Sequence, residues 1–239
     1  MNEYTKNIDP IFVVSPFLRK AVVFGAPLLT VLLLVLHPAG MLTEPTATQP
    51  ATQYGAYAFI AGAADRFVLV HLLFAPMIAL MGLALLLIIR DQQGVAATIS
   101  RVSVFVFVVM YIVYETIIGT ASSFLVRSAR SLPLAEQSVI AEMVNRLWTD
   151  PVFGDGGLIS VIAILAWAVA VTSAAVSLYR SGGALSTSLL LGFAFIFGLH
   201  APPTGPLGQV LFLVAVWQLE RPARTKVVNK EQVAEAVAG

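Results

Sequence analysis

Four residues combine metal-binding or acid–base chemistry with a position in or beside an apolar segment. They are the three histidines of the chain, His37, His71 and His200, and the carboxylate Glu115. Imidazole nitrogens are ligands for Zn, Cu, Fe and Ni, and a carboxylate adds a hard ligand. Three histidines with one glutamate could complete a tetrahedral site, or a three-ligand site with an open position for water. Because no two of them share a local motif such as H-x-x-x-H, only the fold could bring them together.

Each of these residues also has a purely structural interpretation. His37 and His200 each stand at the end of an apolar run, where an imidazole can bond to free carbonyls of a helix end or to water. His71 lies inside a run and could simply hydrogen-bond across helices. Glu115 would be costly to bury unpaired and could serve only to join two helices. Its candidate partners are polar groups near it in sequence or in depth: His71, Arg66, Tyr111 and Tyr114.

The composition indicates the class of protein. Of the 239 residues, 58% are hydrophobic and 11% are charged, and the mean hydropathy is +0.87. A soluble domain typically has about 25% charged residues. The composition therefore excludes an ordinary cytosolic enzyme and a disordered chain, and it favours an all-α integral membrane protein. The net charge of +1 leaves no basic face for nucleic acid, and the absence of cysteine excludes disulfides and thiolate ligands.

Six apolar segments are candidates for membrane-spanning helices, each of which needs roughly 20 residues. They predict a six-helix transmembrane bundle that forms one domain over residues 1–220, followed by a polar cytoplasmic tail at 221–239. The last two segments are short, and a re-entrant hairpin is the alternative there. Arg19 and Lys20 precede the first segment, as in a signal peptide, but no small-residue cleavage site follows it, so we interpret it as a retained helix. The six segments cover residues 21–36, 67–89, 102–126, 158–179, 184–199 and 207–219.

The distribution of basic residues predicts the orientation of the bundle. With the N-terminus inside, ten Lys and Arg residues fall on the inner side and four on the outer side. Since basic residues concentrate on the cytoplasmic side, we expect a multi-pass protein of the cell membrane with both termini in the cytoplasm. The outer set is Arg66, Arg127, Arg130 and Arg146.

The long outer loop at 128–157 carries the pattern of an amphipathic helix. Its apolar residues recur at helical spacing, and polar residues occupy the other face. We expect this helix to lie on the outer membrane surface or to cap the bundle, where it could also contact a membrane protein partner. The apolar stripe consists of Val139, Ile140, Met143, Val144, Leu147 and Trp148.

The predicted topology places all four chemistry-bearing residues in one leaflet. His37 and His200 close their spans on the outer side, and His71 lies five residues beyond Arg66. Glu115 lies thirteen residues beyond Val102, which corresponds to roughly 20 Å from the inner side. We therefore predict a site in the outer half of the bundle, with His37, His71, His200 and Glu115 as ligands of Zn or Cu. In the same site Glu115 is the candidate catalytic base, and a haem held between two of the histidines is an alternative.

Short motifs spread over most of the chain are shared with a group of bacterial membrane proteins. Through them the chain resembles a family of uncharacterised multi-pass bacterial membrane proteins, and the resemblance implies no activity. Membrane hydrolases of the alkaline ceramidase type also hold zinc with three histidines, but they have seven helices and two histidines one turn apart, so the comparison is only an analogy. The shared motifs are His-Pro-x-Gly at 37–40, Arg66 to His71, Tyr114-Glu115 with Gly119-Thr120, Trp148 to Pro151, and His-x-Pro-Pro-x-Gly-Pro at 200–206.

Three classes of function are compatible with these residues. The first is a membrane protein that binds a transition metal or small ligand at the His/Glu site, with a membrane-embedded metalloenzyme as one form of it. The second is a non-catalytic structural or accessory subunit of a membrane complex. The third is a proton-coupled transporter that uses Glu115, although the almost wholly apolar inner half of the bundle counts against full translocation.

Overall fold

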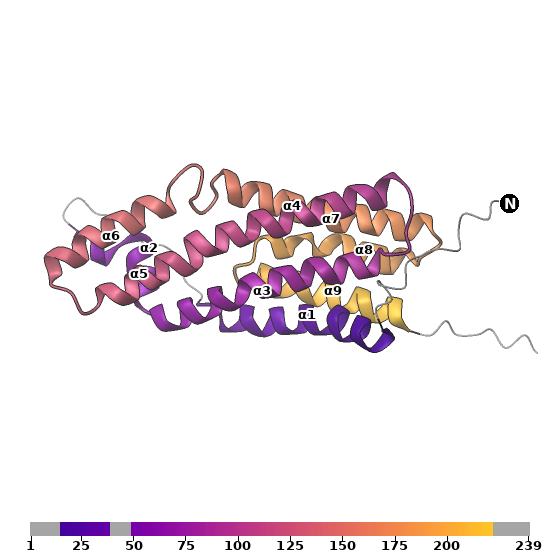
Figure 1. Ribbon diagram of the computed structural model, residues 1–239, viewed down its shortest axis with the longest axis horizontal. Helices are drawn as coiled ribbons and strands as arrows, with labels where there is room; N and C mark the ends of the chain where they lie inside the picture. The colour runs from indigo at the N-terminus through magenta and orange to yellow at the C-terminus, as the bar shows by residue number, and fades with distance from the viewer. Residues whose placement is uncertain (1–14, 39–48, 222–239) are drawn as a thin grey trace, which may run out of the picture.

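The computed structural model describes residues 15–38 and 49–221, and over this part of the chain the structure is all-helical (Figure 1). Within these residues four helices are long and apolar enough to cross a membrane, and the predicted all-helical class is confirmed. The predicted tail, apart from Arg221, and Gly40 of the first motif lie outside the described residues. The four long helices are α1 (Pro16–Leu36), α3 (Ala64–Ile88), the continuous helix from Val95 to Ala129, and α7 (Leu158–Arg180).

Shorter helices complete the described structure. They include α2 and α6 at one end of the molecule, and α8 and α9 beside the long helices (Figure 1). Their bounds are α2 (Gly55–Ala61), α6 (Leu134–Trp148), α8 (Leu185–Phe193) and α9 (Thr204–Glu220), with 3-10 turns at Ala51–Gln53 and Ala194–Gly198.

The third predicted span is longer than the expected range 102–126. It runs for 35 residues and consists of α4 (Val95–Tyr114), a π-helical segment (Glu115–Ala121) and α5 (Ser122–Ala129). Arg101, which was expected to bound the span, lies inside α4 instead. Its guanidinium donates hydrogen bonds to carbonyls of the turn that precedes α4. The long side chain thus carries the charge to the end of the helix, although the residue itself lies inside it.

The fifth predicted span is not a single helix. Over 184–199 the chain folds as α8 followed by the 3-10 turn Ala194–Gly198, and this turn packs against α7. The Trp167 indole N–H donates to the Ala194 carbonyl at 3.0 Å, which takes up a backbone acceptor at the helix break. At 1.5–2.0 Å per residue this segment is about 20–25 Å long, shorter than a bilayer core of about 30 Å. α9 begins three residues before the predicted position 207.

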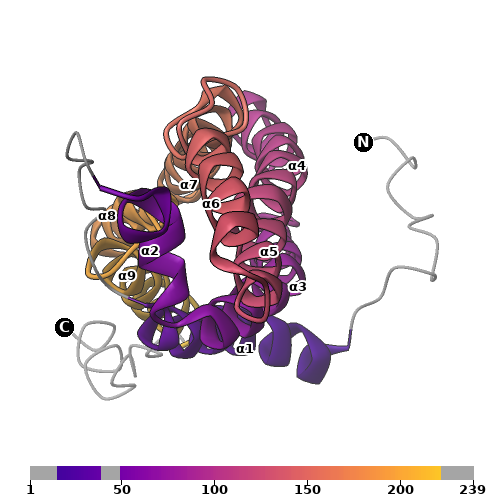
Figure 2. The same cartoon turned by 90° about the vertical axis from the view of Figure 1, so that its left-hand side faces the viewer.

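The long helices pack side by side along the length of the molecule. α4 lies along α7, α1 packs against both α3 and α9, and α8 lies between α7 and α9 (Figures 1 and 2). Small residues permit the close contacts between them, as where Gly208 of α9 meets the backbone of Phe197. The Ser100 hydroxyl of α4 donates to the Ala170 carbonyl of α7 at 2.8 Å and joins these two helices.

The amphipathic helix predicted in the outer loop is α6, and it packs with α2 and α5 at one end of the bundle (Figure 2). The predicted apolar stripe is partly wrong. Val144 is buried, but Val139 and Met143 are 61% and 60% exposed, because α2 and α5 contact the face that carries Ala141 and Val144. The Asn145 side chain strengthens this contact by accepting the Tyr57 N–H of α2 at 2.9 Å.

The contact of Gly208 with Phe197 allows a direct test of the fold. A Cβ atom added at Gly208 would overlap the Phe197 backbone, so Gly208→Ala should lower the free energy of unfolding by about 1–3 kcal/mol. Gly25→Ala in α1 is the matched control, because an added Cβ meets nothing within 4 Å there. We expect the thermal midpoint in detergent to fall for the first variant only. Equal midpoints for both would contradict the packing of α9 on the 3-10 turn.

Candidate metal centre

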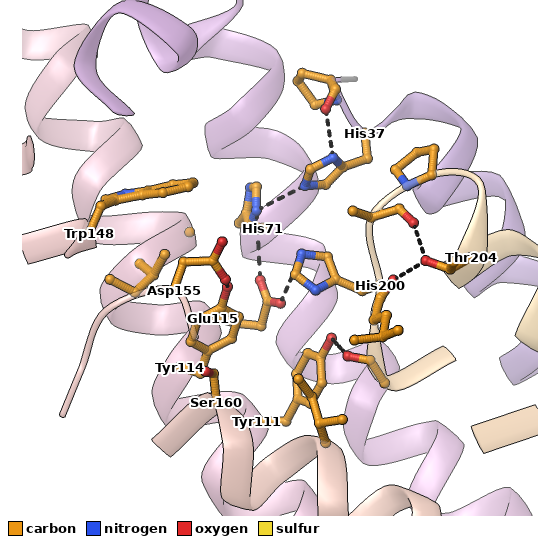
Figure 3. A pocket seen from close by; sticks show the side chains of 18 of the residues that line it. His37, His71, Tyr111, Tyr114, Glu115, Trp148, Asp155, Ser160, His200 and Thr204 are labelled. Carbon is orange, nitrogen blue, oxygen red and sulfur yellow. Dashed lines mark hydrogen bonds and ion pairs between the residues drawn. The ribbon is translucent and has the colours of Figure 1, made fainter. Parts of the chain in front are cut away.

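The four predicted site residues line one cavity of about 340 Å³ near the end of α1 (Figure 3). They come from separate elements: the C-cap of α1, the N-terminal third of α3, the π-helical segment, and the loop after the 3-10 turn. The helix α6 contributes Trp148 to another part of the wall. The structure therefore brings together all four residues that were singled out by type and depth.

The ring of His71 is held on α3 by two contacts with Phe67. Its Nδ1–H donates to the Phe67 carbonyl at 2.8 Å, and the two rings stack with centroids 5.2 Å apart and planes 3° apart. The side chain is buried. Because Nδ1 carries the hydrogen of this bond, Nε2 presents a lone pair to the cavity.

His37 faces His71 from the end of α1. The Nδ1–H of His37 donates to the Pro38 carbonyl at 2.8 Å, and its Nε2 lies 3.3 Å from the Nε2 of His71. With both Nδ1 atoms bonded to carbonyls, the two Nε2 atoms meet as acceptors with no hydrogen between them. A cation or a proton placed between the rings would resolve this conflict.

His200 completes a cluster of three imidazoles. Its ring lies edge-on to that of His37, with centroids 5.4 Å apart, and one ligand nitrogen from each of the three histidines lies within 4.8 Å of the others. His200 follows the 3-10 turn Ala194–Gly198, which packs against α7, α8 and α9.

Glu115 lies beneath the three rings and is 1% exposed. Its Oε2 is 3.8 Å from Nε2 of His71 and its Oε1 is 3.9 Å from Nε2 of His200. Neither oxygen has a hydrogen-bond partner among the described residues. Of the partners expected from the sequence, His71 is close, whereas the tyrosines bond elsewhere. Tyr111 donates to the Gly198 carbonyl at 3.5 Å, and Tyr114 donates to Asp155 at 2.8 Å.

The π-helical segment places Glu115 and makes room for His71. A π-helical turn inserts an extra residue into a helix, and such turns are frequent at functional sites. Gly119 lies in the same segment, and a Cβ atom there would overlap the His71 ring. The segment thus lets the backbone approach the imidazole while Glu115 points into the cavity.

Two lining residues were not recognised from the sequence. Asp155 stands in the loop before α7 and accepts the Tyr114 hydroxyl, although no local pattern distinguishes it from other loop carboxylates. Trp148 was predicted as part of the apolar stripe of the amphipathic helix, but its indole lines the cavity. Only the fold of the 128–157 loop over the bundle end brings these two side chains to the histidines.

The spacing of one pair of nitrogens fits a tetrahedral metal ion. Two nitrogens bound at 2.0–2.1 Å to a tetrahedral Zn²⁺ lie about 3.3–3.4 Å apart. The Nε2 atoms of His37 and His71 are 3.3 Å apart. The backbone carbonyls that hold the two Nδ1–H groups act as the outer partners that orient metal-binding imidazoles. The three histidines could therefore hold a metal ion, with Glu115 next to them as a further oxygen ligand or as a base.

No family model, curated protein or solved structure matches this chain. The fold and the site together define its class. Over residues 15–38 and 49–221 it is all-helical, with four helices that could span a membrane and a cluster of three histidines that could hold a metal ion. The geometry of that cluster is the basis on which a function can be assigned.

The two histidines at helix ends predict a pH dependence of stability in the metal-free protein. Burial lowers the pKa of His200, and the neighbouring His37 and His71 lower it further. Burial also lowers the pKa of His37, partly offset by its bond to the Pro38 carbonyl. As the pH falls through the ordinary value of 6.5, the unfolded chain binds protons before the folded chain does. The free energy of unfolding should therefore decrease from pH 7.5 to pH 5.

Thermal midpoints measured in detergent with a chelator test this dependence. His200→Gln should flatten the decrease in stability between pH 7.5 and pH 5, because the variant lacks a histidine whose protonation the folded protein suppresses. Asp150→Asn is the control, since backbone N–H groups of Phe153 and Val152 lower the pKa of the Asp150 carboxyl and it titrates below this range. A slope that stays the same in His200→Gln would show that His200 is not held neutral by the fold.

Proposed function

We propose that this protein is a multi-pass protein of the cell membrane that binds one transition-metal ion, Zn or Cu, through His37, His71 and His200, with Glu115 as fourth ligand or base. The observation that carries the proposal is the pair of Nε2 atoms that face each other at 3.3 Å. A metal ion accepts both lone pairs and removes the conflict between two acceptors.

The burial of the site supports a cation over an empty cluster. Leaving a buried acceptor unsatisfied costs about 1–3 kcal/mol, and more for a charged group. Both Glu115 oxygens lack a donor in the described part of the chain. A divalent ion would compensate the charge of Glu115 and would also accept the lone pairs of the three imidazoles. A bond between Glu115 and a single histidine would leave the other acceptors unpaired.

The open side of the cluster suits metal-assisted chemistry. Three histidines leave one position of a tetrahedral ion free for water, and a bound metal lowers the pKa of that water. Glu115 lies within 4 Å of two of the histidines, in reach of a ligand at that position. This arrangement supports the enzymatic version of the proposal, in which the protein is a membrane-embedded metalloenzyme and Glu115 acts as the base.

The same proposal includes a bundle of six spans with both termini in the cytoplasm. α8 with its 3-10 turn, and α9, serve as short fifth and sixth spans. They pack among the long helices, which supports their insertion. Large apolar side chains are exposed on the outer faces of the long helices, as expected for contact with lipid. Examples are Leu32, Val35, Leu72, Phe105 and Leu165.

Metal content tests the first part of the proposal. The full chain, purified in detergent without chelator, should contain about one Zn or Cu per chain by elemental analysis. His71→Ala should reduce this to near zero, because it removes a ligand whose Nε2 faces another ligand at 3.3 Å. Ser100→Ala is the matched control, since Ser100 is buried and polar but lies on the contact of α4 with α7.

A second variant retains every ligand and tests their positions. Gly119→Ala leaves all four site residues in place in the sequence, but its Cβ would displace the His71 ring. We expect a loss of roughly 10–100-fold in metal affinity, as for other changes that disturb ligand orientation. If the wild-type chain holds no metal, or if Gly119→Ala folds and binds metal as tightly as wild type, the proposed centre is wrong.

The topology can be tested because the chain has no cysteine of its own. Ser131→Cys, before α6, should react with a membrane-impermeant maleimide on intact cells. Gln93→Cys, in the turn between α3 and α4, should react only after permeabilisation. Both side chains are exposed, and the wild-type chain is the unlabelled control. The reverse labelling pattern would place the His/Glu site on the cytoplasmic side.

A further inference from the structure

The cavity is larger than a metal centre requires. A water molecule in a liquid takes about 30 Å³, so an ion with one or two waters would leave most of the 340 Å³ free. Sites for small organic molecules begin at roughly 300 Å³. The remaining space is therefore large enough for an organic ligand beside the histidines.

Trp148 provides a polar group in the wall of this space. Its indole Nε1–H is buried and has no hydrogen-bond partner among the described residues. The ring extends from α6 toward His71 across the cavity (Figure 3). A buried indole N–H normally has an acceptor, and an acceptor carried by a ligand would satisfy it.

The charges around the cavity restrict the kind of ligand. Two carboxylates, Glu115 and Asp155, line it, and no Lys or Arg lines it within the described residues. A bound divalent ion would balance these two charges, so the loaded cavity would be close to neutral. An anionic ligand finds no basic partner here, and the rest of the wall is largely aromatic or aliphatic, with Phe59, Ile118 and Ile164.

We infer that the cavity binds a small uncharged organic molecule whose carbonyl or similar oxygen accepts the hydrogen bond of the Trp148 indole. This inference names the ligand class of the site proposed above, and it rests on that proposal for the charge of the loaded cavity. The Trp148 indole N–H positions the ligand by donating this hydrogen bond. The other end of the ligand lies toward the three histidines.

Fluorine NMR with 4-fluorobenzamide as the probe tests the inference. The full chain in detergent, as purified and again after chelation, is titrated with the probe, and protein-free micelles give the background. We expect a dissociation constant of about 1 mM or tighter for a probe of this size. Trp148→Phe retains the aromatic packing but removes the donor, and it should weaken binding about threefold to tenfold.

Trp217→Phe is the matched control. Trp217 is on α9 and 49% exposed, with the Arg221 guanidinium over its ring, and it does not line the cavity. It should bind the probe as wild type does. In the chelated sample, where no metal can coordinate a carboxylate, 4-fluorobenzoate should bind at least tenfold more weakly than the amide. Equal affinity of wild type and Trp148→Phe, or preference for the benzoate, would overturn the inference.

The metal content of the same samples separates the two proposals. A chain that contains metal but does not bind 4-fluorobenzamide supports the metal centre and refutes the organic ligand. A metal-free chain that binds the amide through Trp148 refutes the metal centre and retains the ligand site.

Discussion

The Nε2 atoms of His37 and His71 face each other at 3.3 Å because each ring donates its Nδ1–H to a backbone carbonyl. Each carbonyl lies within four residues of the ring that it holds, so the tautomers are set by local contacts. Two acceptors at that distance oppose the packing of α1 on α3 unless a proton or a metal ion lies between them. The packing of α1 on α3 and the chemistry of the site therefore depend on the same pair of nitrogen atoms, and the proposed metal ion would accept both lone pairs.

Three departures from regular α-helix bring the three histidines and Glu115 together. α1 ends at Leu36, which leaves the His37 ring free to turn toward α3. The π-helical segment Glu115–Ala121 points a carboxylate inward and offers Gly119 to the His71 ring. The 3-10 turn Ala194–Gly198 directs the chain so that His200 reaches the same place. Regular helices satisfy their own backbone groups and leave little freedom, so irregular backbone is expected where a bundle forms a site.

The elements at the end of the bundle complete the wall of the cavity beside the histidine cluster. α6 packs against α2 and α5 through Ala141 and Val144, and this contact brings Trp148 over the space beside the histidines. The loop after α6 adds Asp155, which accepts the Tyr114 hydroxyl next to Glu115. The wall opposite the three histidines is thus largely aromatic, and its Trp148 indole N–H has no acceptor among the described residues. Such a wall suits an uncharged organic molecule more than it suits an ion alone.

Composition and depth alone predicted the all-helical class and the gathering of His37, His71, His200 and Glu115, because a polar group in an apolar span is costly and its distance along a helix gives its depth. The sequence could not predict the break after Phe193, the extension of the third span from Val95 to Ala129, or the exposure of Val139 and Met143. These features depend on contacts between segments far apart in the chain, such as the bond from Trp167 to Ala194 and the packing of α6 on α2 and α5. Residue type and depth thus determined which groups could form a site. Only the tertiary structure decided their distances, their tautomers and the cavity around them, because those follow from helix packing and not from local periodicity.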